Sequence, residues 1–164
     1  MSKRREPAKG HPETAVATAA LSGELAADIR GLIEAARLRV AQTVNSELVL
    51  LYWEIGSRIR RDILSEARAQ YGDEIVSTLS RQLSTDYGAG FSRQNLFRMI
   101  RFVEAWPDQA QVTTLGQHLG WSHFKEILYL ENELARQFYA EMCRVERWSV
   151  RTLRKSPRSP AITA

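Results

Sequence analysis

The residues best suited to chemistry lie in one short segment, and their types suit binding rather than covalent catalysis. Arg93, Gln94 and Asn95 come first, and Arg98 and Arg101 follow at helical spacing. Arginine makes bidentate hydrogen bonds to guanine, glutamine and asparagine make them to adenine, and all three donate to phosphate oxygens. At about 100° per residue, Gln94, Arg98 and Arg101 fall within about 60° of one another on a helix. The segment therefore predicts a helix face that contacts DNA.

The opposite side of the same helix is apolar, as a helix that packs on a core requires. Leu96, Ile100 and Val103 form this predicted core-facing side. The polar side could also be an ordinary solvent-exposed face without any DNA contact, because surface helices commonly carry two or three arginines.

Arginine dominates the basic residues of the chain. Of 23 basic residues four are lysine, so 19 are arginine, and the formal net charge is +4. The planar guanidinium group matches phosphate oxygens and so favours a nucleic-acid partner, although the codon bias of a GC-rich genome gives the same composition. A second arginine group, Arg58, Arg60 and Arg61, could contact the phosphate backbone or offset the negative end of a helix dipole.

The residue patterns that enzymes use are missing. His11, His118 and His123 have no carboxylate or cysteine partners at metal-ligand spacing, and Cys143 has no motif around it. The turn at residues 88–90 contains two glycines but lacks the preceding strand and the following lysine of a phosphate-binding loop. We therefore expect no catalytic residues, no metal site and no cofactor.

The single cysteine and the hydropathy of the chain bear on its location. One cysteine excludes an internal disulfide, and no window approaches the roughly 18 apolar residues of a membrane span. We therefore expect a cytoplasmic protein without a membrane segment.

The N-terminal third predicts a tail and then a long helix. Residues 1–22 mix basic residues, proline, glycine and alanine without periodicity and predict a disordered basic tail. Apolar residues then recur at steps of three or four from residue 24 to about residue 70, which indicates one long helix or two that join near residues 42–46. Such a stripe is typical of helix pairing in a homodimer, and packing within one chain explains it equally well.

Two shorter helices and a turn follow. Residues 73–87 predict one helix, residues 88–91 a glycine-containing turn, and residues 92–106 a second helix with Ser92 as its N-cap and Phe91 and Leu96 as a hydrophobic staple. Two helices joined by a short turn are what a helix-turn-helix requires, although antiparallel helical hairpins look similar. The second helix carries the polar face described above and would be the recognition helix.

The C-terminal part also reads as helical. A polar stretch covers residues 108–114, Ser122 is the expected cap of a helix to about residue 130, and Ser149 is the expected cap of a last helix with Trp148 and Leu153 as its staple. Between them a helix is predicted from an apolar stripe formed by Leu134, Phe138, Met142 and Val145. Because no segment alternates with period two, the predicted fold class is all-α, with a long N-terminal helix followed by a helix-turn-helix-like helical bundle.

Several ordered motifs resemble the N-terminal domain of the YhcG-like nuclease family. They are Leu51-Tyr52-Trp53-Glu54-Ile55-Gly56, Tyr71-Gly72, Phe91-Ser92-Arg93-Gln94-Asn95-Leu96-Phe97-Arg98-Met99, Leu119-Gly120-Trp121-Ser122-His123-Phe124, Ala135-Arg136-Gln137-Phe138-Tyr139 and Trp148-Ser149-Val150-Arg151-Thr152-Leu153. The resemblance covers about residues 29–154. We expect the motif aromatics Tyr52, Trp53 and Trp121 to be core residues rather than base-stacking ones, because they lie beside apolar residues in helical register.

The resemblance implies a winged-helix or helix-turn-helix module that is followed by a nuclease domain of the PD-(D/E)xK type. That second domain would need acidic residues and a lysine to hold Mg²⁺ and activate water. No (D/E)xK tripeptide occurs in this sequence, and after residue 154 two prolines interrupt the helical pattern. The expected organisation is a basic tail over residues 1–22, a helical DNA-binding domain over residues 23–154 and a disordered tail over residues 155–164.

These observations favour a DNA-binding domain that targets a nuclease and has no catalytic centre of its own. The chain would be a truncated or stand-alone member of the family, or the targeting half of a nuclease whose catalytic domain is encoded separately. The alternative from another class is a helical protein-interaction or dimerisation module that docks a nuclease or restriction-type partner without binding DNA.

Overall fold

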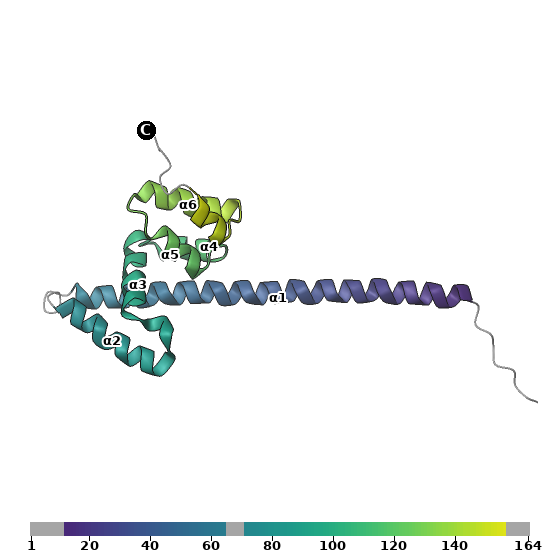
Figure 1. Cartoon of the computed structure of the whole chain (residues 1–164), viewed down its shortest axis with the longest axis horizontal. Helices are drawn as coiled ribbons and strands as arrows, with labels where there is room; N and C mark the ends of the chain where they lie inside the picture. The colour runs from purple at the N-terminus through teal and green to yellow at the C-terminus, as the bar shows by residue number, and fades with distance from the viewer. Residues whose placement is uncertain (1–11, 65–70, 157–164) are drawn as a thin grey trace, which may run out of the picture. The chain divides into compact units, whose positions relative to one another are not determined.

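The computed structural model of the chain describes residues 12–64 and 71–156 (Figure 1). Its helices are α1 (Pro12–Ile63), α2 (Gly72–Tyr87), the 3₁₀ turn η2 (Ala89–Phe91), α3 (Arg93–Ala105), α4 (Gln109–Gly116), α5 (Trp121–Ile127), α6 (Glu133–Val145) and α7 (Val150–Lys155). No strand occurs within these described ranges, which confirms the all-α class. The chain divides into two units, Met1–Ala41 and Gln42–Ala164.

Helix α1 settles two questions that the apolar periodicity left open. It is a single helix, with no break near residues 42–46. It also begins at Pro12, which corrects the expected tail boundary at residue 22. Proline is favourable at the first position of a helix, and Glu13 in the first turn complements the helix dipole. The rest of the two expected tails, residues 1–11 and 157–164, lies outside the described residues.

The segment from α2 to α3 has the elements that its sequence predicts. Gly88 ends α2 with a φ of 92°, in the left-handed region that favours glycine. The hydroxyls of Ser80 and Ser84 donate to the carbonyl oxygen of Phe91 at 2.9 and 3.3 Å and hold the turn against α2. The Oγ of Ser92 accepts from the backbone N–H of Asn95 at 3.2 Å, which confirms the predicted N-cap of α3.

Within the unit Gln42–Ala164, helices α1 and α3 separate two apolar clusters. The smaller cluster contains Ile59 from α1, Val76 from α2, and Leu96 and Met99 from α3. The larger cluster joins the same two helices to helices α4 to α7, with Phe102, Trp106, Phe124, Tyr139 and Leu153 among its members. Helix α3 therefore packs on both sides, and this fixes the direction in which its remaining side chains point.

The crossing of α1 and α3 depends on a glycine. A Cβ atom on Gly56 would lie 2.1 Å from the backbone oxygen of Met99, well inside van der Waals contact. Only a residue without a side chain allows the two backbones to approach this closely. The crossing is stabilised on one side by the indole N–H of Trp53, which donates to the carbonyl oxygen of Trp106 at 2.7 Å in a buried position.

The motif aromatics are core residues, as expected. Trp53 is 9% exposed, and Tyr52 and Trp121 are half-buried with their ring centroids 5.0 Å apart.

Two polar side chains of α1 add hydrogen bonds to backbone carbonyls of the same unit. Asn45 donates to Leu119 at 3.2 Å, and Ser46 donates to Gly116 at 2.8 Å. The aromatic motifs therefore assemble the unit around the C-terminal half of α1.

In the C-terminal part the structure assigns a helix to the polar stretch at residues 108–114, and it corrects the predicted cap of the next helix. The polar stretch after Pro107 is helix α4, because Asp108 caps it and its apolar positions Val112 and Leu115 are buried. The N-cap of α5 is Gly120 rather than Ser122, with the side chain of His123 accepting from the N–H of Gly120 at 3.1 Å.

Helix α6 turns a different face to the core from the one predicted. Its buried residues are Ala135, Tyr139, Ala140 and Cys143. The predicted stripe is instead exposed at Leu134, Phe138 and Val145, at 64%, 44% and 56%. Small residues let α6 approach its neighbours closely, and this outweighs the larger apolar side chains on the adjacent face. No helix among the described residues is long and apolar enough to span a lipid bilayer.

We predict that Gly56→Ala destabilises the chain by about 3 kcal/mol, because the new methyl group would collide with a backbone oxygen that cannot move without shifting α3. Chemical denaturation followed by circular dichroism measures the loss. Gly31→Ala is the matched control, since a Cβ there meets nothing within 4 Å. Alanine favours helix over glycine by about 1 kcal/mol, so an unchanged or raised stability for both variants would contradict the close crossing.

Candidate nucleic-acid interface

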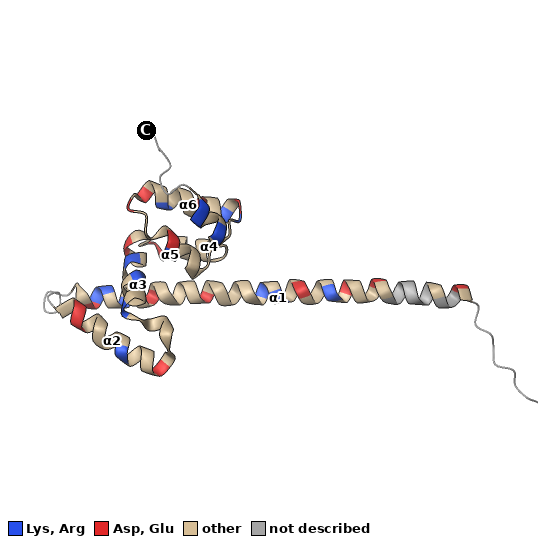
Figure 2. Ribbon diagram, in the orientation of Figure 1, with Lys and Arg blue, Asp and Glu red and all other residues tan. Residues whose placement is uncertain are grey.

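Helix α3 presents its arginines on the side that its two apolar contacts leave free. Arg98 and Arg101 lie half-buried and exposed, respectively, while Leu96, Met99 and Phe102 are fully buried. Figure 2 marks basic residues in blue on the ribbon of α3. Leu96 and Val103 are buried as predicted, Ile100 is half-buried, and the structure adds Met99 and Phe102 to the core-facing side.

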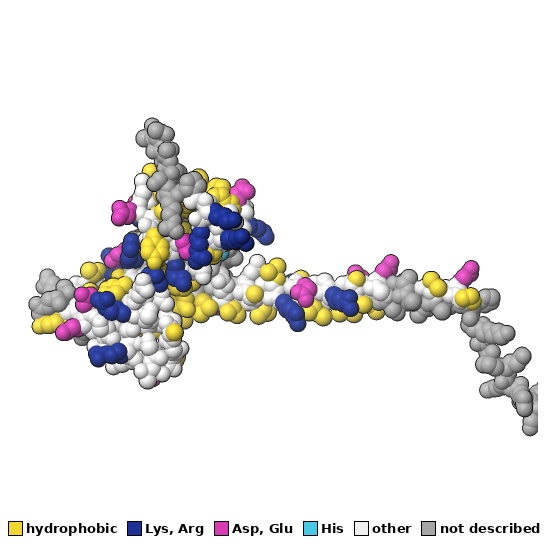
Figure 3. All heavy atoms as spheres, in the orientation of Figure 1, with side chains coloured by type: hydrophobic (Ala, Val, Ile, Leu, Met, Phe, Trp, Pro, Cys, Tyr) yellow, Lys and Arg dark blue, Asp and Glu magenta, His cyan; other side chains and the backbone are white. Residues whose placement is uncertain are grey.

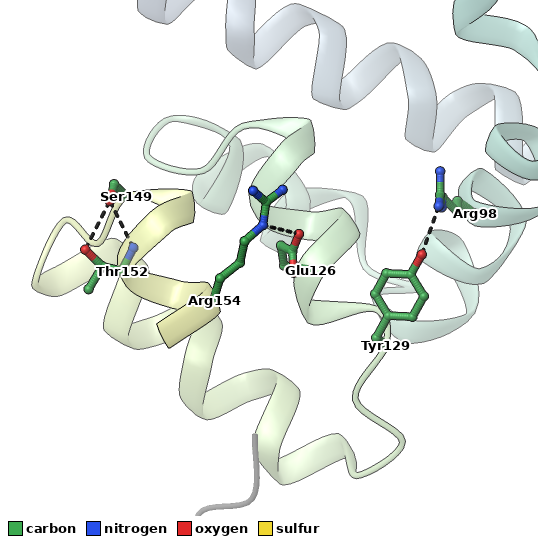
Figure 4. A network of polar contacts seen from close by, with 6 residues as sticks. All are labelled: Arg98, Glu126, Tyr129, Ser149, Thr152 and Arg154. Carbon is green, nitrogen blue, oxygen red and sulfur yellow. Dashed lines mark hydrogen bonds and ion pairs between the residues drawn. The ribbon is translucent and has the colours of Figure 1, made fainter. Parts of the chain in front are cut away.

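The guanidinium group of Arg98 forms hydrogen bonds at both terminal nitrogens, of which Figure 4 draws the one to Tyr129. Nη1 donates to the Oδ1 of Asn95 at 2.9 Å, and Nη2 donates to the hydroxyl of Tyr129 at 2.8 Å. The guanidinium carbon also lies 6.0 Å from the centroid of the Tyr129 ring, within cation–π range. Arg98 therefore has a defined direction rather than a freely moving side chain.

Two further arginines bind the same loop, which connects α5 to α6. Arg101 donates from Nη2 to the carbonyl oxygen of Leu128 at 3.1 Å. Arg136 of α6 donates from Nη1 to the carbonyl oxygens of Leu130 and Glu131 at 2.8 and 3.0 Å. Arg101 and Arg136 line a common pocket with Leu128 of the loop, and the carboxylate residue Glu104 lines the same pocket.

All the acceptors that hold these three arginines are electrically neutral. They are a phenol, an amide oxygen and backbone carbonyls. Within the described part of the chain, Arg98, Arg101 and Arg136 form no ion pair with a carboxylate, so three fixed positive charges remain uncompensated by such a pair around one loop.

Other arginines of the chain are paired with carboxylates. The pairs include Arg58 with Asp62 at 3.8 Å, Arg60 with Glu104 at 3.7 Å, Arg93 with Asp73 at 3.5 Å, Arg154 with Glu126 at 2.7 Å, and Arg144 with Glu141. The last pair is direct enough that the hydrogen bond from Arg144 lowers the pKa of Glu141. Partial neutralisation makes these side chains weaker candidates for a phosphate than the three at the loop.

The three predicted contact residues at the N-terminal end of α3 have different surroundings. The guanidinium of Arg93 lies 4.9 Å from the ring centroid of Phe97, and Gln94 is exposed. Asn95 holds the preceding turn, because its Nδ2 donates to the carbonyl oxygen of Gly90 at 3.2 Å while its Oδ1 accepts from Arg98. The side chain of Asn95 thus positions the turn and Arg98 in this structure.

The second predicted arginine group does not act as one cluster. Arg60 comes beside α3 because its buried Nε forms an ion pair with the carboxylate of Glu104, and this Nε has no hydrogen-bond acceptor among the residues that the structure describes. Arg58 lines an open groove between the end of α1 and α2, and Arg61 is exposed. Helical spacing spreads these residues around α1, so only Arg60 joins the surface that contains Arg101 and Glu104.

Sequence reasoning missed basic residues near the C-terminus. Arg136 was passed over, as were Arg147, Arg151 and Lys155, which are exposed on or beside α7. Figure 3 shows basic side chains gathered over the part that carries α6 and α7. For the residues on or beside α7, the sequence does contain an indication, because five basic residues fall within residues 144–155.

His123 and Cys143, two further titratable residues, are held by hydrogen bonds or by burial. The Nε2 of His123 lies 2.9 Å from the carbonyl oxygen of Trp148, and its Nδ1 accepts from Gly120, so both ring nitrogens have partners. No group of three or more potential metal ligands occurs in residues 12–64 and 71–156. Burial raises the pKa of the Cys143 thiol to about 11.

Comparison with known proteins identifies the family. The model of the DUF1016 N-terminal domain matches residues 28–161, which include α2 to α7 and the whole surface described above. The chain belongs to the DUF1016 N-terminal domain family. This confirms the resemblance found in the sequence motifs.

One relative of this DUF1016 domain is a protein of Escherichia coli (strain K12) named "Putative nuclease YhcG". It is 39% identical over 72 residues, which cover 43% of this chain and 19% of the relative. The chain thus matches about a fifth of the length of that protein. No solved structure matches the chain.

We predict that Cys143 reacts with iodoacetamide at least about 100-fold more slowly in the folded chain than after denaturation. A thiol pKa raised from 9.0 to about 11 leaves about 100-fold less thiolate near neutral pH, and burial restricts access further. Mass spectrometry of the alkylated chain measures the rates. Leu38→Cys in a Cys143→Ala background provides an exposed control, and equal rates for the two cysteines would show that Cys143 is accessible.

Proposed function

We propose that this DUF1016 N-terminal domain binds DNA through Arg98, Arg101 and Arg136 and thereby directs a nuclease to its substrate. The observation that carries the proposal is the anchoring of these three guanidinium groups by neutral acceptors at residues 128–131. A phosphate would meet positive charges that no carboxylate in the described chain offsets by an ion pair.

Preorganisation adds to the electrostatic argument. Arginine has five N–H donors, and the hydrogen bonds to the loop use only some of them, so donors remain for phosphate oxygens. A side chain already held in place loses less conformational entropy when it binds a ligand. The anchored arginines are therefore better phosphate ligands than flexible surface arginines of equal charge.

Contacts from the beginning of α3 would complete the interface. Gln94 is exposed, and Arg93 is exposed beside it, so both could reach base edges or phosphates. Asn95 would contribute by directing Arg98, and it could contact a base only if its amide left the turn. Arg60 would meet the phosphate backbone at the edge of the site, whereas Arg58 and Arg61 lie on other sides of α1 and would contact DNA only outside it. In this proposal α2, η2 and α3 act as the helix-turn-helix.

We predict that Arg98→Ala plus Arg101→Ala weakens binding to duplex DNA and lowers the salt slope by about one to two ion equivalents, since two phosphate contacts are lost. Fluorescence anisotropy at several salt concentrations measures both quantities. Arg30→Ala plus Arg81→Ala removes the same formal charge from exposed positions of α1 and α2 and should change the slope much less. Equal effects of the two double variants would show that binding depends only on total charge and not on this site. Absence of duplex binding by the parent chain would contradict the proposal.

A second function is favoured by a separate observation on α6. The exposed side chains of Leu134, Phe138 and Val145 recur at helical spacing and could dock a protein such as a nuclease domain, whether in the same polypeptide or encoded separately. Arg98 and Arg101 would then be purely structural. The docking function is supported if the parent chain binds no DNA and if Phe138→Glu abolishes capture of a purified nuclease domain of the family.

We predict that the purified 164-residue chain with Mg²⁺ or Mn²⁺ does not cut single-stranded, duplex or branched DNA. The reason lies in its residues, since the sequence has no (D/E)xK tripeptide to position a metal-bound water and a lysine. Gel assays with end-labelled substrates measure cleavage. Cleavage that persists through purification and is lost on substitution of a carboxylate of this chain would show that it has a catalytic centre.

A further inference from the structure

The part of α1 within the unit Met1–Ala41 carries an exposed apolar stripe. Leu25, Ile29, Leu32, Ile33 and Val40 are 61%, 46%, 70%, 47% and 63% exposed. Together with Ala36 they fall within about 100° of arc on the helix. Figure 3 shows hydrophobic side chains in a row along one edge of α1.

This stripe has no partner among the described residues of its own unit. From Pro12 to Ala41 the unit contains only this stretch of α1. Isolated helices are marginally stable in water, and an amphipathic helix gains most of its stability by burying its apolar face. A helix pairing with the stripe would supply that burial.

Acidic and basic residues are separated along the same stretch of α1, so two copies with opposite directions can bring unlike charges together. Residues 12–29 contain Glu13, Glu24 and Asp28 and no basic residue, whereas residues 30–41 contain three arginines, at 30, 37 and 39, and a single carboxylate, Glu34. A parallel pair would set acidic half beside acidic half. An antiparallel pair centred on the stripe sets Glu24 and Asp28 of each copy beside Arg37 and Arg39 of the other, and it also opposes the two helix dipoles.

We propose that a second copy of this chain covers the stripe, with the two α1 segments antiparallel. One register places every stripe residue opposite another apolar residue. In it Leu25 faces Val40 of the second copy, Ile29 faces Ala36, and Leu32 faces Ile33. The same register brings Asp28 close to the level of Arg37 and Arg39 of the second copy. The pairing is independent of the proposed DNA contacts, which lie in the other unit.

The oligomeric state of the full 164-residue chain tests the pairing. Sedimentation equilibrium should give a dimer for the parent chain and a monomer for Leu32→Glu, because a carboxylate at the centre of the stripe would be buried. Leu38→Glu is the matched control, since Leu38 is 61% exposed but lies on the opposite side of the helix. The control should remain a dimer. A monomeric parent chain, or equal behaviour of the two variants, would overturn the proposal.

Cysteine cross-linking tests the orientation in a Cys143→Ala background. An antiparallel pair brings residue 25 of one copy near residue 40 of the other, within reach of a disulfide. A mixture of Leu25→Cys and Val40→Cys chains should therefore form the mixed disulfide under mild oxidation, and neither variant alone should cross-link. Efficient cross-linking of Leu25→Cys to itself would indicate parallel helices and overturn the antiparallel arrangement.

Discussion

The close approach of α1 and α3 at Gly56 is the constraint on which the domain depends. With no side chain at this position, the backbone of α1 reaches the carbonyl of Met99, and α3 can bury residues on two sides at once. The hydrogen bond from Trp53 to Trp106 then fixes the end of α3, about one helical turn from Gly56 on α1 and about two turns beyond Met99 on α3. Any residue larger than glycine would push the helices apart and loosen both apolar clusters.

This crossing also determines the electrostatics of the surface. Once α3 is fixed, Arg98 and Arg101 reach the loop between α5 and α6, where they meet a phenol and a carbonyl rather than carboxylates. Hydrogen bonds to neutral acceptors restrain a guanidinium group without cancelling its charge. The fold therefore uses some arginines as connectors between helices and leaves their charge available, while ion pairs neutralise others at the surface.

Local sequence signals predicted the elements of this domain well where the deciding contacts are local. The glycine-containing turn, the Ser92 and Ser149 caps and the helical class depend on hydrogen bonds and periodicities within a few residues. The same reasoning failed on α6, where Leu134 and Phe138 were chosen for their size. The adjacent face, with Ala135 and Ala140, is the one that neighbouring helices approach.

The candidate site shows the same division. The sequence alone determined the helix that carries Arg98 and Arg101, the face on which they lie, and the family to which the chain belongs. It could not determine which arginines keep an unpaired charge, because Tyr129, Leu128 and Glu104 come beside them only when α1, α3 and the α5–α6 loop pack together. Charge compensation is a property of distances between side chains far apart in the sequence, and only the tertiary structure decides those distances.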